Sequence, residues 1–474
     1  MLLLVLGSFF FASPRSIVPF YFNHVPPSPL PTKLLWKVAH ACPLPLFFII
    51  AAAFLLYRLL AAIFAILSGT SAIRPSWTIS TRLIHSFVQS MTEVIPPQAR
   101  HTYLLCRIFT TIPIPSFLVR ARVETVNISM LDSSLWDKVW LFVAGTSCPV
   151  KYSNTEFIKG EWVMHYDVKP KSMEESHIVL YLHGGAHMMG SPGSHRGLIS
   201  ALSKSIKCPI LAIDYTVSPE ALFPTAIYQS LKAYQSLIQG PTATTKSIIP
   251  TSHVFFTNPS SSYTFKHSQI TIIGDSSGGC LALQTLLLLP HTNLPPPSSV
   301  VFLSPHTDIS MSQAIISPNL ASDILAFDSV GYTYGKHLYT DFPITHPLVS
   351  PCFTTDFSAL SGVKVLIQVG DAEILLGDSV RLFEGVKQRG GAGCEVEMQI
   401  WKDCFHVWQA FPGVAAKEAI LKVGEFVRRE RALDEGDSSG NMFSRFVHKN
   451  VKGWEQCVGE EGRRRRRLER AWSI

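Results

Sequence analysis

The chain has few charged residues and few cysteines, and it lacks the spacings that hold metal ions or disulfide scaffolds. Charged residues make up 16% of its 474 residues, and its nine cysteines are scattered without a C-x-x-C pair. No group of histidines has metal-ligand spacing either. The sequence therefore predicts neither a zinc site nor a disulfide-rich domain.

A basic face for nucleic acid is also missing. The formal net charge is +7, but residues 463–474 hold six arginines and one glutamate, which leaves only +2 on the rest. We therefore expect no nucleic-acid partner. Residues 432–474 are predicted to form a basic, solvated tail, and contact of its arginines with anionic lipid is the alternative.

One long hydrophobic run stands out near the N-terminus. Residues 44–67 contain a single charge, Arg58, and as a helix they would extend about 36 Å, against roughly 30 Å for the bilayer core. The run predicts a transmembrane helix, with a buried core helix as the alternative. We expect a single-pass membrane protein, with the endoplasmic reticulum as one candidate location. The nearby Lys and Arg residues are too evenly placed to give its orientation.

The distribution of apolar and polar residues divides the rest of the chain into segments. Residues 1–43 form an apolar and polar leader, and residues 68–168 are predicted to be a linker with N-terminal cap or lid elements. From residue 169 to 431, short apolar runs alternate with helical stretches. Because such strands are apolar throughout, they predict a mostly parallel sheet covered by helices on both faces, an α/β fold. The predicted strands are Ile178–Leu182, Pro209–Asp214, Ile270–Gly274, Val300–Leu303, Val363–Val369 and Val396–Trp401.

A longer interruption, Pro305–Leu360, has helical character of its own. It predicts a partial lid over the carboxyl edge of the sheet, with apolar positions around Leu325 and Phe327.

The first chemical motif is Gly274-Asp275-Ser276-Ser277-Gly278, between an apolar strand and an apolar helix. Glycines beside a serine allow a tight turn that projects the hydroxyl from the sheet edge, as in a nucleophile elbow. A phosphate-binding loop is the alternative, but no lysine stands at the required position.

The second motif, His183-Gly184-Gly185-Ala186, also follows a strand directly. A glycine-rich turn at a strand end can aim consecutive N–H groups at one developing negative charge. Alone it could be a plain turn, but with the elbow it predicts an oxyanion hole made by Gly184, Gly185, Ala186 and Ser277.

With these motifs the chain resembles the hormone-sensitive-lipase branch of the α/β-hydrolases, and in particular fungal esterases with an N-terminal anchor. The HGGG box of that branch is similar to residues 183–186, and its GDSAGG elbow is similar to Gly274–Gly279. Asp214-Tyr215 and Ser218-Pro219-Glu220 match two further family blocks. The resemblance covers residues 169–429 and implies an α/β-hydrolase fold; Ala186 departs from it by replacing the third glycine.

The resemblance also implies the remaining catalytic residues, in the order acid and then histidine. It places the acid at Glu373, after the strand Val363–Val369, with Asp371 and Asp378 as alternatives. His406 follows the strand Val396–Trp401 and is the predicted general base for Ser276.

We therefore predict a serine esterase or lipase that forms an acyl-enzyme on Ser276 and needs no cofactor. The expected substrate is an apolar ester of a lipid or sterol. A homologue that binds a ligand without turnover is the alternative, and the presence of His406 argues against it. A membrane interaction protein that uses the domain as a scaffold is a third hypothesis.

Overall fold

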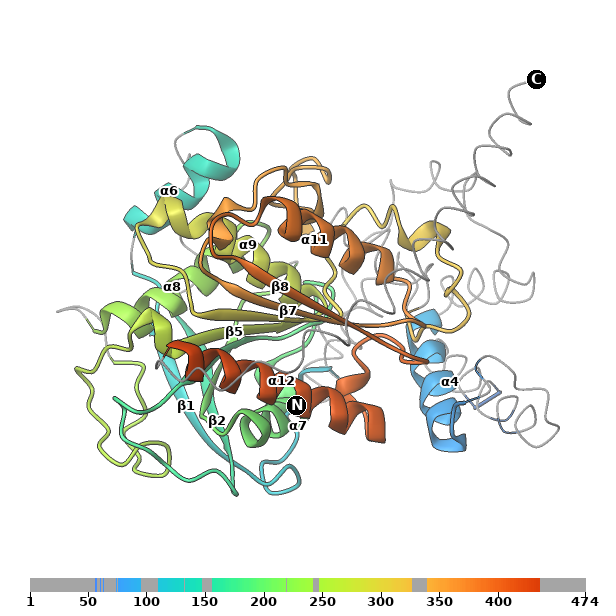
Figure 1. Cartoon of the computed structure of the whole chain (residues 1–474), viewed down its shortest axis with the longest axis horizontal. Coiled ribbons are helices and arrows are strands. Elements are labelled where there is room, and N and C mark those ends of the chain that lie inside the picture. Colours follow the sequence, from blue (N-terminus) through green and yellow to red (C-terminus); the bar gives the residue numbers. More distant parts are fainter. Residues whose placement is uncertain are drawn as a thin grey trace, which may run out of the picture. The chain divides into compact units, whose positions relative to one another are not determined.

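A single eight-stranded sheet organises the described part of the chain (Figure 1). The computed structural model describes residues 76–94, 110–131, 133–146, 156–218, 220–241, 247–325 and 339–434, with isolated positions 56, 57, 60, 63 and 74. The strand order is β1-β2-β4-β3-β5-β6-β7-β8. The strands are β1 (Ala121–Ser129), β2 (Phe157–His165), β3 (Ile178–Leu182), β4 (Ile210–Asp214), β5 (Ile270–Asp275), β6 (Ser299–Leu303), β7 (Lys364–Gly370) and β8 (Glu395–Trp401).

Six strands, β3 to β8, run parallel, and β2 is antiparallel to both β1 and β4. The parallel strands at the centre are buried on both faces, so both sets of alternating side chains are apolar. In β3, Leu180 packs into the core on one face, whereas Val179 and Tyr181 pack into the core on the other. This explains why the central strands read as continuous apolar runs.

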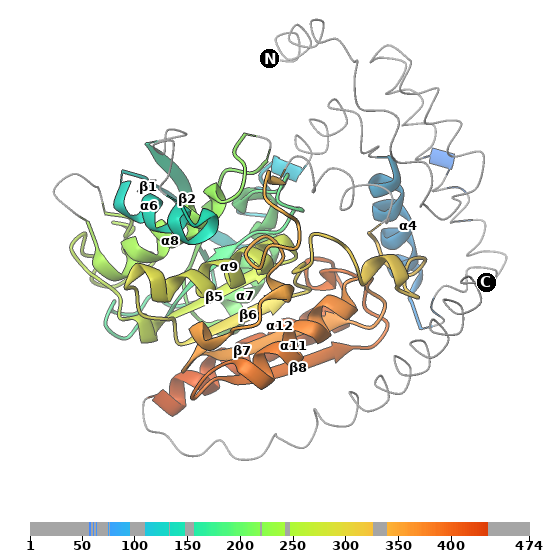
Figure 2. The same cartoon turned by 90° about the horizontal axis from the view of Figure 1, so that it is seen from above.

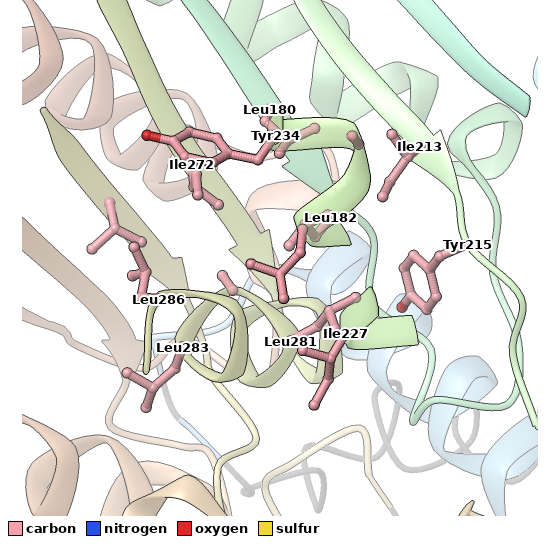
Figure 3. Close-up of a cluster of buried hydrophobic side chains, with 14 of the residues drawn as sticks. Leu180, Leu182, Ile213, Tyr215, Ile227, Tyr234, Ile272, Leu281, Leu283 and Leu286 are labelled. Carbon is pink, nitrogen blue, oxygen red and sulfur yellow. The ribbon is translucent and has the colours of Figure 1, made fainter. Parts of the chain in front are cut away.

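Helices cover both faces of the sheet (Figures 1 and 2). The larger core lies under α6, α8, α9 and α11, and the smaller one lies under α7 and α12. Figure 3 shows part of the larger core, where Leu180 and Ile272 of the sheet face Leu281 and Leu286 of α9. The helices are α6 (Ser133–Ala144), α7 (Pro192–Ile206), α8 (Thr225–Gln239), α9 (Ser277–Thr292), α11 (Leu376–Arg389) and α12 (Val414–Asp434).

The parallel arrangement decides where loops meet. The carboxyl ends of β3, β5, β6, β7 and β8 lie at one edge of the sheet, so the loops that follow them are neighbours. Those loops carry the glycine-rich motif, Ser276, Glu373 and His406, whereas the block Asp214-Tyr215 lies at the end of β4. The predicted α/β-hydrolase sheet and its six parallel strands are therefore present, with boundaries that differ from the predictions by one residue at most.

The sheet is larger than predicted at its first edge. β1 and β2 belong to it and pair over nine residues from Ala121↔His165 to Ser129↔Phe157, although residues 68–168 were assigned to a linker and cap. Charged and apolar residues alternate along β1, because it is the edge strand and is partly exposed. The first half of β2, which pairs with its far end, also carries the charged Lys159 and Glu161. That pattern hid them among the other polar segments, and the sheet starts at Ala121 instead of near Lys169.

The predicted membrane helix, 44–67, lies almost wholly outside the described residues. Among the residues that the structure describes, no helix combines the length and apolar character needed to span a bilayer. A shorter helix, α4 (Ile79–Val94), follows that run in the chain and lies near the carboxyl ends of β7 and β8 (Figure 1). The tail from residue 435 onward is likewise outside the described part.

The predicted lid is described only in part, since residues 326–338, including Phe327, are outside the described ranges. Residues 305–325 are folded onto the loops at the carboxyl edge, and Ile324 belongs to a buried cluster with Phe405 and Ala372. The described part of this segment therefore serves as packing for those loops. A lid remains a prediction.

Candidate active site

Ser276 sits at a sharp turn between β5 and α9. Its backbone has φ 51° and ψ −121°, a region that costs a non-glycine residue about 1–3 kcal/mol. The end of β6 holds the turn in place: Ser276 N donates to Leu303 O at 2.9 Å, and Ser276 O accepts from His306 N at 3.0 Å. The strained turn projects the serine side chain from the sheet edge, as the sequence predicts.

The glycines of the turn are required by contact. A Cβ on Gly278 would lie 2.0 Å from Leu182 O, and one on Gly274 would lie 2.2 Å from Gly278 O. Both distances are far below van der Waals contact, and both partners are backbone atoms that cannot rotate away. The two glycines therefore let the elbow and the end of β3 approach each other.

His406 and Glu373 complete a relay with Ser276. The His406 Nε2 atom lies 2.9 Å from Ser276 Oγ, and its Nδ1 atom lies 3.1 Å from Glu373 Oε2. When Nδ1 carries the proton and donates to the carboxylate, Nε2 is left to accept from the serine hydroxyl. Three loops that are distant in sequence thus meet in one hydrogen-bonded chain.

Glu373 is fully buried and held on its other oxygen. Its Oε1 atom accepts from Gly370 N at 2.6 Å and from Ser304 Oγ at 2.7 Å, and Ser304 Oγ in turn accepts from Val407 N at 3.1 Å. Ser304 therefore links the loop of the acid to the loop of the histidine. The sequence analysis missed Ser304, since a serine after a strand has no distinguishing pattern.

The site raises the basicity of the histidine. Burial disfavours the charged imidazolium, but the hydrogen bond and charge of Glu373, with the charges of Asp323 and Asp275, outweigh it and raise the pKa of His406 above 6.5. A raised pKa suits a group that takes up a proton during the reaction.

The alternative acids lie elsewhere. Asp371 Oδ1 accepts from Asp403 N at 2.7 Å, and Arg74 lies 3.9 Å from the same carboxylate. Asp378 is buried, and neither of its oxygens has a hydrogen-bond partner in the described part of the chain. Burial, followed by the charge of Asp308, raises the pKa of Asp378 well above its usual value. Among the three candidate carboxylates, Glu373 is the one that hydrogen-bonds His406.

The glycine-rich loop lies against the elbow. His187 N donates to Ser277 Oγ at 3.1 Å, and Gly185, Ala186 and His187 have φ values of 126°, 54° and 59°. Consecutive positive φ values turn neighbouring N–H groups toward the same side. In the described structure, no acceptor is found for the N–H groups of Gly185, Ala186 and Ser277, and Ser277 is also the first residue of α9, whose N-terminus favours negative charge.

Gly184 was predicted as a fourth oxyanion donor, and this part of the prediction is wrong. Its N–H donates to Asp275 Oδ1 at 2.9 Å, so it is occupied. Tyr181 OH donates to the same oxygen at 2.5 Å. Asp275 thus fixes the loop to the elbow, a role that the motif Gly-Asp-Ser did not reveal.

Two neutral histidines border the site. Burial, followed by the charges of His306 and His183, lowers the pKa of His187 to about 3. Burial also lowers the pKa of His306 to about 4, against the opposing charge of Asp308. Both ring nitrogens of His187 and Nε2 of His306 lack hydrogen-bond partners among the described residues. His306 was not singled out in the sequence.

Comparison with known proteins identifies relatives of this chain. The sequence profile of the alpha/beta hydrolase fold matches residues 179–410. An acetyl-hydrolase of Streptomyces hygroscopicus is 30% identical over 271 residues, which are 56% of this chain and 79% of that protein. The chain belongs to the α/β-hydrolase fold family.

Other members of this family give the same picture. An esterase of Acinetobacter venetianus RAG-1 is 29% identical over 253 residues, 52% of this chain and 74% of that protein. The crystal structure of EstE5 soaked with p-nitrophenyl butyrate has a TM-score of 0.54 and 26% identity, and the match covers 74% of this chain and 97% of EstE5. The predicted enzyme class, a carboxylic ester hydrolase, is confirmed by these relatives, whereas membership of a fungal, membrane-anchored type stays a prediction.

Proposed function

We propose that the chain hydrolyses carboxylic esters through an acyl-enzyme on Ser276. The observation that carries the proposal is the relay in which His406 Nε2 lies 2.9 Å from Ser276 Oγ and His406 Nδ1 lies 3.1 Å from Glu373 Oε2. His406 takes the hydroxyl proton as Ser276 Oγ attacks the carbonyl carbon, and Glu373 stabilises the imidazolium.

The tetrahedral intermediate then collapses with its negative charge facing the N–H groups of Gly185, Ala186 and Ser277. His406 gives its proton to the departing alcohol, and the acyl group stays on Ser276. Water, activated by His406 in the same way, attacks the acyl-enzyme and releases the carboxylic acid. The two hydrogen bonds that begin the reaction, between Ser276 and His406 and between His406 and Glu373, are already formed, so this relay is preorganised.

We propose an apolar ester with a short acyl group as the substrate. Support comes from the acetyl-hydrolase among the relatives. The buried surroundings that keep His187 and His306 neutral also favour an uncharged substrate over a charged one. A lipid or sterol would supply the apolar alcohol. This choice rests on the resemblance and on the apolar run at residues 44–67.

Acyl-chain profiling tests the function. The full chain in mild detergent should cleave p-nitrophenyl esters, with acetate or butyrate preferred over long chains. Ser276→Ala and His406→Ala should each lower kcat by at least about 10⁴-fold, because members of a relay fail as a unit. Thr292→Ser, a conservative change at the far end of α9, is the control and should keep wild-type rates. Unchanged turnover in Ser276→Ala would refute the proposal.

We also propose that residues 44–67 anchor the enzyme in a membrane. The support is their length and their single charge, Arg58. The anchored chain should stay in the membrane pellet after carbonate extraction, and deletion of residues 44–67 should release it. Release of the undeleted chain by carbonate would overturn this assignment.

A further inference from the structure

The segment from residue 74 to residue 94, here called the strap, lies over the two loops that carry His406 and Glu373. It is separated in sequence from both loops by about 300 residues. Trp77 Nε1 donates to Asp403 O at 2.6 Å, and the edge of the Trp77 ring meets Phe405 at 5.9 Å between ring centroids and 88° between planes. The strap thus contacts the residues immediately before His406.

The strap also reaches the loop of the acid. One Arg74 amino group donates to Asp371 O at 3.3 Å and to Asn319 Oδ1 at 3.1 Å. Asn319 Nδ2 donates to Asp371 O at 2.8 Å and to Glu373 O at 2.9 Å. Arg74 and Asn319 together fix the backbone on both sides of residue 372.

Asp323 connects the strap to both loops at once. Its Oδ1 accepts from His406 N at 3.0 Å, and its Oδ2 accepts from Ile374 N at 2.7 Å. Its own main-chain oxygen accepts from two side chains of α4, His85 Nε2 at 3.0 Å and Gln89 Nε2 at 3.1 Å. One residue therefore holds the backbone of the histidine, the backbone next to the acid, and the strap.

Burying a carboxylate at position 323 costs more free energy than a purely structural role would require. The Asp323 side chain is fully buried, and it shares this space with the carboxylate of Glu373. A neutral side chain would avoid the repulsion between two buried carboxylates. Burial raises the pKa of Asp323 to about 6, so its carboxylate is ionised above that pH. In that form it makes stronger hydrogen bonds to N–H groups and adds negative charge beside the imidazole. The hydrogen bonds hold the backbone of His406 in place. The negative charge stabilises the imidazolium that forms during the reaction.

Given the proposed esterase function, on which this inference rests, we propose that Asp323 is a positioning residue through which the strap sets the geometry of His406 and Glu373. No contact with Ser276 is found for the described side chains of the strap. They act through two backbone positions, His406 and Ile374, so the relay is complete only when α4 is docked.

The strap arm of the test uses the full chain. The variant His85→Ala/Gln89→Ala removes both donors to Asp323 O, and Phe87→Ala, on the exposed side of α4, removes a side chain of similar size as the matched control. The double variant should lower both kcat and kcat/KM about 10-fold or more with KM within twofold, since misplacement of catalytic groups acts on the transition state. Its rate of labelling by a fluorophosphonate should fall by the same factor. Phe87→Ala should behave as wild type.

A conservative variant separates positioning from loss of bulk. His85→Gln, with Gln89 unchanged, keeps an N–H donor at nearly the same reach from Asp323 O. Its kcat should therefore be close to that of the wild type and higher than that of the single variant His85→Ala. If His85→Gln and His85→Ala were equally slow, the hydrogen bond to Asp323 would not be the cause, and the proposal would fail.

The carboxylate arm uses Asp323→Asn and the pH dependence of kcat/KM. The titratable groups that face Asp323 are His85 from α4, Glu373 from the turn after β7, and His406 from the loop after β8. Loss of its charge should move the acidic limb of the profile to lower pH, because the negative charge of Asp323 helps to raise the pKa of His406. A packing role alone would slow the enzyme without moving the limb.

The outcomes keep the two proposals apart. If Ser276→Ala retains activity, the proposed function fails whatever the strap does. If wild-type enzyme is labelled but cleaves no ester, labelling rates still test the strap. Wild-type kcat and labelling in His85→Ala/Gln89→Ala, with an unshifted limb in Asp323→Asn, would overturn the strap proposal while leaving the relay intact.

Discussion

At the scale of single residues, the chemistry depends on which carboxylate faces the imidazole. Resemblance to a family pointed to Glu373, with Asp371 and Asp378 open. The geometry separates them: Glu373 contacts His406, Asp371 accepts from the backbone of Asp403, and Asp378 has no partner among the described residues. A glutamate can serve here because Gly370 N and Ser304 Oγ hold its longer side chain from behind.

Glu373→Gln should therefore lower kcat by about 10³–10⁴-fold, since the amide cannot balance the charge of the imidazolium and can hold the wrong tautomer. Steady-state hydrolysis of p-nitrophenyl butyrate measures this. Asp371→Asn is the matched control and should lose less than about 10-fold, because among the described residues its carboxylate contacts the Asp403 N–H and Arg74. An equal loss in both variants would argue against Glu373 as the acid.

The pH profile should reflect the raised pKa of His406. The histidine works as a base only when neutral, so kcat/KM should rise with pH along a limb centred above 6.5, the usual value for imidazole. Removal of the adjacent charge in Glu373→Gln should shift that limb downward. A wild-type limb centred below 6.5 would contradict the electrostatic account of the site.

At the scale of elements, the strand-turn-helix unit of β5 and α9 was readable because its signals are local. A buried apolar strand, two glycines and an apolar helix are adjacent in the chain, and no tertiary information is needed to join them. The oxyanion loop was read in the same way, but the role of Gly184 was not. Its N–H is taken by Asp275, which is 91 positions away in sequence, and such a pairing has no local signature.

A side chain on a glycine of this strand-turn-helix unit should distort the turn that carries Ser276. Gly278→Ala places a Cβ against Leu182 O and His183 O, so the elbow must shift, at a stability cost of about 1–3 kcal/mol or more. Urea unfolding monitored by tryptophan fluorescence measures the cost, and fluorophosphonate labelling should be lost with it. Gly413→Ala is the control, since a Cβ there meets nothing within 4 Å. Equal behaviour of the two variants would refute the steric argument.

At the scale of the whole molecule, the buried strands β3 to β8 could be predicted from their apolar sequences. The strands β1 and β2 could not, because they carry charged residues and β1 is partly exposed. Their membership depends on pairing with β4. Trp162 and Met164 of β2 nevertheless lie fully inside the larger core. The sequence analysis also missed the strap and its partner Asp323. Arg74, Trp77 and Asp323 each contact residues far away in sequence, and such contacts leave no local pattern.

A truncation series tests the enlarged domain. A chain that starts at Lys169 lacks β1 and β2, so it exposes the edge of β4 and leaves the core without Ile158, Trp162 and Met164. It should be insoluble or unfold without cooperativity. A chain that starts at Arg74 keeps both strands and the strap, and it should unfold in one transition in a calorimeter. Cooperative unfolding of the shorter chain would contradict the role given to β1 and β2.

The central claim is that Ser276 is activated by His406, and peptide mass spectrometry after reaction with a fluorophosphonate tests it most directly. Wild-type chain should carry one adduct, on the peptide that contains Ser276, and His406→Ala should form it at least about 10³-fold more slowly. An adduct on another serine, or an undiminished rate in His406→Ala, would contradict the account.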